Sequence, residues 1–186
     1  MKNQSIENQA DASLLKGFCT FCMGSYEPLR MGAHVRRCRD RKDDADCIQT
    51  NGQEHPMAFL LMIGILGWPG AWLCLEAHSQ ASLSDLEFFI RHVWFPETKE
   101  EGMFLFQKRA VQKRFSEGGG ADSSLDEILK VKDHFCLVEM DGKTPVQITV
   151  DVAGHLPTAI MHRPIDVVAF PLDNNGGRMP AGGQRS

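Results

Sequence analysis

The sequence predicts an α+β fold, and three features support this prediction. Three cysteines and one histidine, residue types that commonly bind metal ions, lie near the N-terminus at a spacing typical of a metal site. Short apolar runs separated by Gly and Pro turn signals follow, as expected of antiparallel hairpins. Residues 82–94 then show the apolar spacing of an amphipathic helix. We therefore expect a small metal-bound unit followed by a domain of antiparallel β-hairpins packed on one main helix.

The first feature lies within residues 18–41 and has the spacing C-x2-C-x11-H-x3-C. The residues that form it are Cys19, Cys22, His34 and Cys38. Two cysteines two residues apart can close around one metal from a tight turn, and a His and a Cys four apart share one face of a helix. The pattern predicts a small ββα-type zinc finger over residues 17–42. The expected cofactor is one structural Zn²⁺ ion, because protein side chains fill all four positions.

A unit of this size cannot fold on apolar burial alone, so metal binding should supply most of its folding free energy. Phe21, Leu29 and Val35 are candidates for its small apolar core. Two alternatives remain open: Cys47 replaces Cys38 as the fourth ligand, or the four residues are metal-free side chains that share this spacing by chance.

Positive charge is concentrated in the same segment. Between positions 16 and 42 there are seven basic residues and two acidic ones, whereas the whole chain has a net charge of −4. A basic unit on an acidic body suggests an anionic partner for the unit alone. The arginines expected to contact phosphates or base edges are Arg30, Arg36, Arg37, Arg39 and Arg41.

The rest of the chain divides by composition. Residues 1–16 and 173–186 are polar or rich in Asn, Gly and Pro, and we expect them to be disordered tails. Residues 43–56 are polar without apolar periodicity and are expected to form a linker. Residues 57–172 should form the α+β domain.

Residues 57–75 carry no charged side chain. By length they could form a membrane-spanning helix, which is one alternative. Gly-Trp-Pro-Gly at 67–70 interrupts the run with turn chemistry, so we favour a buried β-hairpin of residues 57–66 and 71–77.

The main helix is expected at residues 82–94. Ser82 and Asp85 have the spacing of a capping box, and Pro96 follows the end of the helix. The apolar face of the helix comprises Leu83, Leu86, Ile90, Val93 and Trp94. Beyond the helix, the sequence predicts a strand at 103–106, a helix at 124–129, a strand at 135–140, a turn at Asp141-Gly142 and a strand at 146–152. The basic run 107–114 is a candidate second anion-binding patch.

Three stretches of this domain carry a family resemblance: AWLCLEAHSQASLSDLEFFIRHVW (71–94), SSLDEILKVKDHF (123–135) and VQITVDVAG (146–154), with a Gly turn at Gly142. Their order resembles the Ri-plasmid ORF-three-like family, whose members are often encoded on mobile elements and sometimes carry an N-terminal Cys/His finger. The resemblance implies an α+β fold in which strands pack on the 82–94 helix. It implies no reaction.

The sequence shows no clear catalytic constellation. Cys74 and Cys136 fit buried strand positions, where a thiol is inert. The pair Asp133-His134 and the histidines His155 and His162 lack neighbours in sequence that would complete a site. Cysteine usage suits thiols and metal in a reducing cytoplasm, and the polar N-terminus does not resemble a signal peptide. We expect a cytoplasmic binding protein and not an enzyme, and an enzyme of unrecognised class stays open as a third alternative.

Two functions follow from these features. The first is binding of DNA or another nucleic acid through the basic finger, by a protein of a mobile genetic element. The binding should be only weakly sequence-selective, because a single finger reads only about three base pairs. The alternative is a protein-protein interaction, in which the chain is an adaptor or inhibitor that docks on a host machinery such as a defence system. Neither requires a membrane, and the sequence leaves the oligomeric state open.

Overall fold

The computed structural model describes residues 16–49, 56–96, 103–105, 120–141, 144–160 and 163–171. An eight-stranded antiparallel sheet runs through it, in the order β2-β1-β8-β4-β3-β7-β6-β5. The α+β prediction is confirmed at this level. The expected tails, apart from residue 16, and the basic run 107–114 lie outside the described residues.

The strands follow from the apolar runs of the sequence. They are β1 (Gly17–Cys19), β2 (Ser25–Tyr26), β3 (Met57–Ile65), β4 (Trp68–His78), β5 (Met103–Leu105), β6 (His134–Asp141), β7 (Thr144–Pro157) and β8 (Ile165–Pro171). The expected pairings of β3 with β4 and of β6 with β7 are confirmed. The turn of the first hairpin is Leu66-Gly67, so Trp68, Pro69 and Gly70 belong to β4 and not to the expected turn. Residues 142–143, between β6 and β7, lie outside the described residues. The apolar run 57–75 therefore forms strands. In the parts of the chain that are described, no helix is long and apolar enough to cross a membrane.

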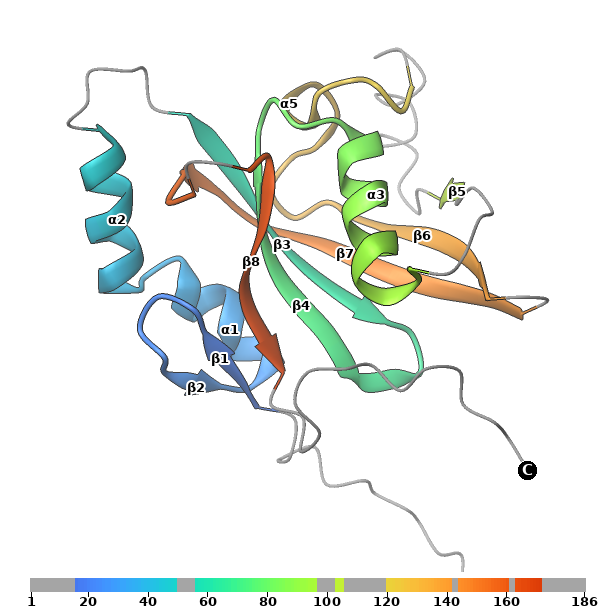
Figure 1. The fold of residues 1–186 in the computed structure, drawn as a ribbon, viewed down its shortest axis with the longest axis horizontal. Coiled ribbons are helices and arrows are strands. Elements are labelled where there is room, and N and C mark those ends of the chain that lie inside the picture. The colour runs from blue at the N-terminus through green and yellow to red at the C-terminus, as the bar shows by residue number, and fades with distance from the viewer. Residues whose placement is uncertain are drawn as a thin grey trace, which may run out of the picture.

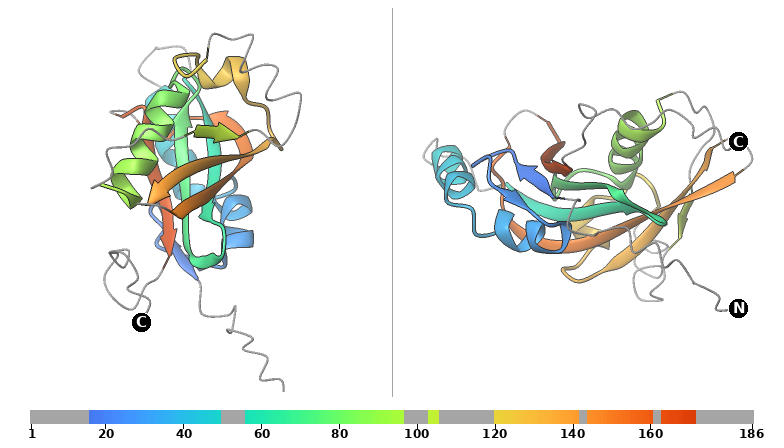
Figure 2. Two further views of the ribbon diagram at one scale, coloured as in Figure 1. Left: turned by 90° about the vertical axis from the view of Figure 1, so that its right-hand side faces the viewer. Right: turned by 90° about the horizontal axis from the view of Figure 1, so that it is seen from below.

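Helices cover both faces of the sheet (Figures 1 and 2). They are α1 (Pro28–Val35), α2 (Arg39–Gln49), α3 (Leu83–Trp94) and the short α5 (Leu125–Ile128). Alternate residues of β3 contribute to two separate apolar cores: Leu61 and Ile63 join the core with α3 and α5, whereas Leu60 joins the core with α1. Helix α1 thus packs on the face opposite α3, and the expectation of one main helix is not confirmed.

Helix α3 begins where the sequence predicts. Ser82 Oγ accepts a hydrogen bond from Asp85 N at 3.0 Å, and Asp85 Oδ2 accepts one from Ser82 N at 2.8 Å. The capping box therefore satisfies two backbone donors at the helix start. The expected apolar face was wrong at Val93, which is 37% exposed, whereas Phe89 packs against the core instead.

The N-terminal segment differs most from the expectation. Strands β1 and β2 and helix α1 follow one another in the order of a ββα unit, but β1 also pairs with β8 over three residues. Cys19, Met31 and Val35 share an apolar core with Trp72 and Val168. The segment is therefore continuous with the main sheet (Figure 1), and its apolar burial comes largely from the sheet.

The expected linker was wrong in its first half, because residues 43–49 complete α2. Cys38, Arg41 and Ala45 are buried at the spacing of one helix face. The central residue of that face is an arginine, which binds a buried carboxylate, so the segment shows no apolar periodicity in the sequence.

Candidate metal centre

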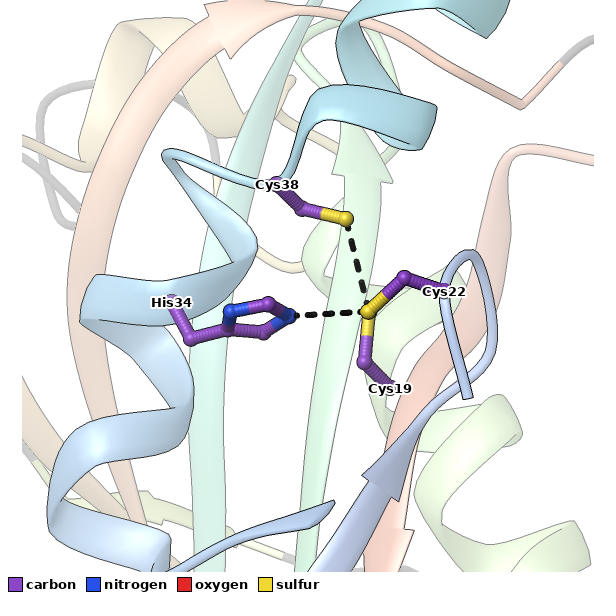
Figure 3. Close-up of side chains that lie close together, drawn as sticks. All are labelled: Cys19, Cys22, His34 and Cys38. Atoms are coloured by element: carbon purple, nitrogen blue, oxygen red, sulfur yellow. Dashed lines mark hydrogen bonds between the residues drawn. The ribbon is translucent and has the colours of Figure 1, made fainter. Parts of the chain in front are cut away.

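Each of the four predicted ligands comes from a different local structure, and all four converge (Figure 3). Cys19 ends β1, and Cys22 lies in the turn between β1 and β2. His34 lies in the last turn of α1, and Cys38 lies between α1 and α2. One ligand atom of each residue lies within 4.8 Å of the others, so the group could hold a metal ion.

Two separations define the cluster more closely. Cys22 Sγ lies 3.3 Å from His34 Nε2, and Cys19 Sγ lies 4.0 Å from Cys38 Sγ. Cys19 is fully buried and Cys38 is 3% exposed, whereas Cys22 and His34 are half-buried. The converging group contains Cys38, and Cys47 is an exposed residue near the far end of α2.

The turn that carries Cys22 is held by backbone hydrogen bonds. Met23 N donates to Cys19 O at 2.9 Å, and Cys19 N donates to Gly24 O at 3.0 Å. Met23 has a φ of 56°, in the left-handed region. Gly24 N lies 3.4 Å from Cys22 Sγ and donates to it.

His34 is oriented by its neighbour Tyr26. The two rings stack with their centroids 3.8 Å apart and an interplanar angle of 20°. This packing directs Nε2 toward Cys22. Burial lowers the pKa of His34, which favours the neutral imidazole, and that is the form that binds metals.

The neighbouring cysteines oppose the ionisation of Cys19. Burial raises the pKa of Cys19 to about 11, and negative charge on Cys38 and Cys22 contributes in the same direction, against backbone hydrogen bonds that lower it. A divalent cation at the centre of the cluster would offset this repulsion and replace the thiol protons.

The structure places the predicted arginines in two different environments. Arg30, Arg36, Arg37 and Arg39 are exposed. The expectation for Arg41 was wrong, because this residue is 2% exposed and Arg41 Nε donates to Glu76 Oε2 at 2.9 Å. Its NH2 group also donates to the carbonyl of Pro157 at 2.7 Å, so the guanidinium cannot reach a phosphate.

Leu29 was wrongly assigned to the small apolar core and is 96% exposed. Val35 is fully buried, and Phe21 packs against the core while half-buried. The expected core was incomplete because most of its members come from the sheet, including Leu60, Trp72 and Val168.

Sequence reasoning missed Glu76, which organises the region behind the metal centre. This carboxylate is fully buried and accepts hydrogen bonds from Arg41, from Thr158 Oγ1 at 2.8 Å and from Ala159 N at 2.5 Å. The sequence does contain a signal for this residue, because Glu76 falls on the same face of the strand as Trp72 and Cys74. A glutamate on a buried strand face indicates a buried charge with a partner.

Of the remaining candidate residues, Cys74 lies in the apolar core that also contains Cys19 and Cys38. Cys74 and Cys136 are buried in β4 and β6. His134 Nδ1 lies 2.6 Å from Asp151 Oδ1 across the β6–β7 pair, and His155 contacts Ser79 at 2.9 Å. His162 lies outside the described residues. Comparisons of the chain with protein-family models, curated proteins and solved structures return no match.

Proposed function

We propose that the four-residue cluster binds one structural zinc ion and that the segment around it binds nucleic acid with weak sequence selectivity. Three cysteines and one histidine are a common donor set for zinc. A tetrahedral zinc with sulfur ligands at 2.3 Å requires neighbouring ligand atoms about 3.8 Å apart. The 3.3 Å and 4.0 Å separations support this assignment.

The role of the zinc is structural in this proposal. Protein ligands fill all four positions, so no position is left for a water or a substrate. The ion would join the β1–β2 turn to the junction of α1 and α2. These elements already contact the sheet, so the metal adds rigidity to a segment that is partly held by apolar packing.

The observation that carries the nucleic-acid proposal is the position of Arg36 and Arg37. Both lie between the ligands His34 and Cys38, both are exposed, and neither has an acidic partner among the described residues. Arg37 N donates to the carbonyl of His34 at 2.8 Å. A bound metal would therefore fix the backbone of two adjacent, unpaired cations, which suits contacts with phosphates.

The surrounding charge limits the strength of this binding. Arg30 lies 4.0 Å from Glu27, and Arg39 lies 3.9 Å from Asp43. Because these two arginines have nearby carboxylates, we expect strong phosphate contacts from Arg36 and Arg37 only. Two such contacts give a slope of log affinity against log salt of about −1.8, which is about a 12-fold loss between 50 and 200 mM salt.

The test is a fluorescence-anisotropy titration of the zinc-loaded chain with a short labelled duplex at several salt concentrations. The double variant Arg36→Glu/Arg37→Glu should bind at least about tenfold more weakly than the wild type and lose most of the salt dependence. Lys130→Glu, at an exposed site beside α5, is the matched control and should bind like the wild type. Equal binding by all three chains contradicts the proposal.

A second candidate function is docking on a protein, and the exposure of Leu29 and Met23 favours it. Leu29 is 96% exposed and Met23 is 63% exposed, both in the metal-binding segment. Large apolar side chains at such exposure are typical of contact sites when they cluster. This function predicts a specific complex that survives nuclease treatment and is lost with Leu29→Asp. If nuclease abolishes every complex, the protein-docking function is excluded.

A further inference from the structure

The metal-binding turn also forms one wall of a groove with a volume of about 600 Å³. Thr20 and Phe21 line this wall. The opposite wall comes from the chain before and within β8, where Ala159, Ile160, Arg163 and Asp166 line the groove. Its volume is in the range of small-molecule and nucleotide sites.

The two walls are held in place by contacts that do not require a ligand. Thr20 N and Thr20 Oγ1 both donate to the carbonyl of Val168, at 3.0 and 3.1 Å. On the other wall, the buried carboxylate of Glu76 accepts hydrogen bonds from Thr158 and Ala159. The groove is therefore preformed, which lowers the entropy cost of binding in it.

The lining combines an aromatic ring with one cation and one anion. Phe21 is half-buried, packs against the core with α1 and lines the groove. Arg163 is exposed and has no acidic partner among the described residues. Asp166 Oδ1 accepts a hydrogen bond from Val167 N at 2.8 Å, which leaves its other oxygen as an acceptor.

We propose that this groove binds one unpaired nucleotide of a single strand, with the base stacked on Phe21 and a phosphate on Arg163. The inference rests on the nucleic-acid function proposed above and specifies its substrate as a single strand. Base stacking on an aromatic side chain is favourable for every base, and a nearby arginine adds charge contacts with the backbone. A paired base is not available for this stacking.

Asp166 gives the groove a preference among bases. A carboxylate oxygen accepts a hydrogen bond from the exocyclic amine of cytosine, whereas thymine presents a carbonyl at the same position. The carbonyl oxygen of thymine and the carboxylate oxygen of Asp166 would repel each other. Oligodeoxycytidine should therefore bind more tightly than oligothymidine of the same length, by about tenfold for one discriminating contact.

The experiment compares labelled oligodeoxycytidine, oligothymidine and a short duplex in anisotropy titrations of the zinc-loaded full chain. Phe21→Leu keeps apolar volume but removes the aromatic face, and Arg163→Met removes the charge. Each should weaken binding of oligodeoxycytidine about tenfold and leave duplex binding unchanged. Asp166→Asn should reduce the preference for cytidine over thymidine. Lys130→Glu is the surface-charge control, and zinc content and circular dichroism confirm that each variant is folded.

The outcomes separate this inference from the broader proposal. If duplex binding depends on Arg36 and Arg37 but oligodeoxycytidine binding is unchanged in Phe21→Leu and Arg163→Met, the groove is not a nucleotide site and the broader proposal stands. If Phe21→Leu abolishes a protein complex without affecting either nucleic acid, the groove belongs to a protein partner. If the wild type binds no nucleic acid, both proposals are overturned.

Discussion

Arg41 Nε donates to Glu76 Oε2 at 2.9 Å, and the two side chains are only 3% and 1% exposed. The pair joins α2, which follows the last metal ligand, to the centre of the sheet in β4. Because Glu76 also accepts from Thr158 and Ala159, one buried carboxylate fixes both α2 and the groove wall. The N-terminal segment is thus held on the sheet by an ion pair as well as by the β1–β8 pairing and apolar packing.

Removing one partner of this pair should be costly. Arg41→Met leaves Glu76 buried without its cation, and we expect the free energy of unfolding to fall by about 3–5 kcal/mol. Arg41→Met/Glu76→Leu should lose less than the sum of the single variants, because no charge remains unpaired. Urea denaturation of the zinc-loaded chain measures both.

Arg39→Met is the matched control for this prediction. Arg39 and Asp43 are 3.9 Å apart, with side chains 90% and 65% exposed, so their pair should contribute less than about 1 kcal/mol. The proposed role of Arg41 is incorrect if Arg41→Met and Arg39→Met have equal stability.

Gly17 is required by close packing at the start of β1. A Cβ atom at this position would overlap the carbonyl oxygen of Phe170 and the ring of Trp72. Gly17→Ala should therefore destabilise the protein by about 1–3 kcal/mol, through displacement of β1 from β8. Gly64→Ala is the control, because its nearest new contact is Thr149 Oγ1 at 3.5 Å. Thermal denaturation should show a lower Tm for Gly17→Ala than for Gly64→Ala, and the reverse order would contradict this packing.

The serines that precede α3 and α5 are not equivalent as caps. Ser82 accepts a hydrogen bond from the backbone of α3, whereas Ser124 contacts the side chain of Asp126 and makes no backbone cap. Ser82→Ala should lower the free energy of unfolding by about 1 kcal/mol, and Ser124→Ala by much less. Chemical denaturation of the two variants tests this, and equal losses would show that the Ser82 cap contributes nothing specific.

The non-ligand cysteines should differ in reactivity. Burial raises the pKa of Cys74, so its thiol stays protonated near neutral pH and becomes a thiolate only at much higher pH. Cys47 is exposed on α2. Iodoacetamide at about pH 8 should therefore alkylate Cys47 in the folded protein and leave Cys74 unmodified, because the thiolate is the nucleophile. Peptide mass spectrometry measures both sites, and modification of Cys74 before Cys47 would contradict the buried position.

Local signals in the sequence were sufficient for part of this structure. The β3–β4 hairpin was predictable from the Gly and Pro residues at 67–70, although the turn itself is Leu66-Gly67 and Trp68 already begins β4. The start of α3 follows from the spacing of Ser82 and Asp85. The spacing of Cys19, Cys22, His34 and Cys38 also predicted their convergence. Each of these features depends on residues close together in the chain.

Contacts between distant segments were not predictable in the same way. The pairing of β1 with β8 joins residues about 150 positions apart, and no local pattern specifies it. The same is true of Arg41, whose burial depends on Glu76 and Pro157. From the sequence alone, Arg41 and Arg36 were therefore equally good candidates for phosphate contacts, although Arg36 is exposed and Arg41 is buried. The family resemblance, the mobile-element origin and the cytoplasmic location stay predictions.

The most direct test of the central proposal is the metal content of the full chain, purified without added metal and measured by inductively coupled plasma mass spectrometry. The wild type and Cys47→Ser should each contain one zinc ion per chain, whereas Cys22→Ser should lose it. The reason is that Cys22 belongs to the converging group of four residues and Cys47 does not. A wild-type chain without stoichiometric zinc, or an equal zinc content in Cys22→Ser, would contradict the assignment.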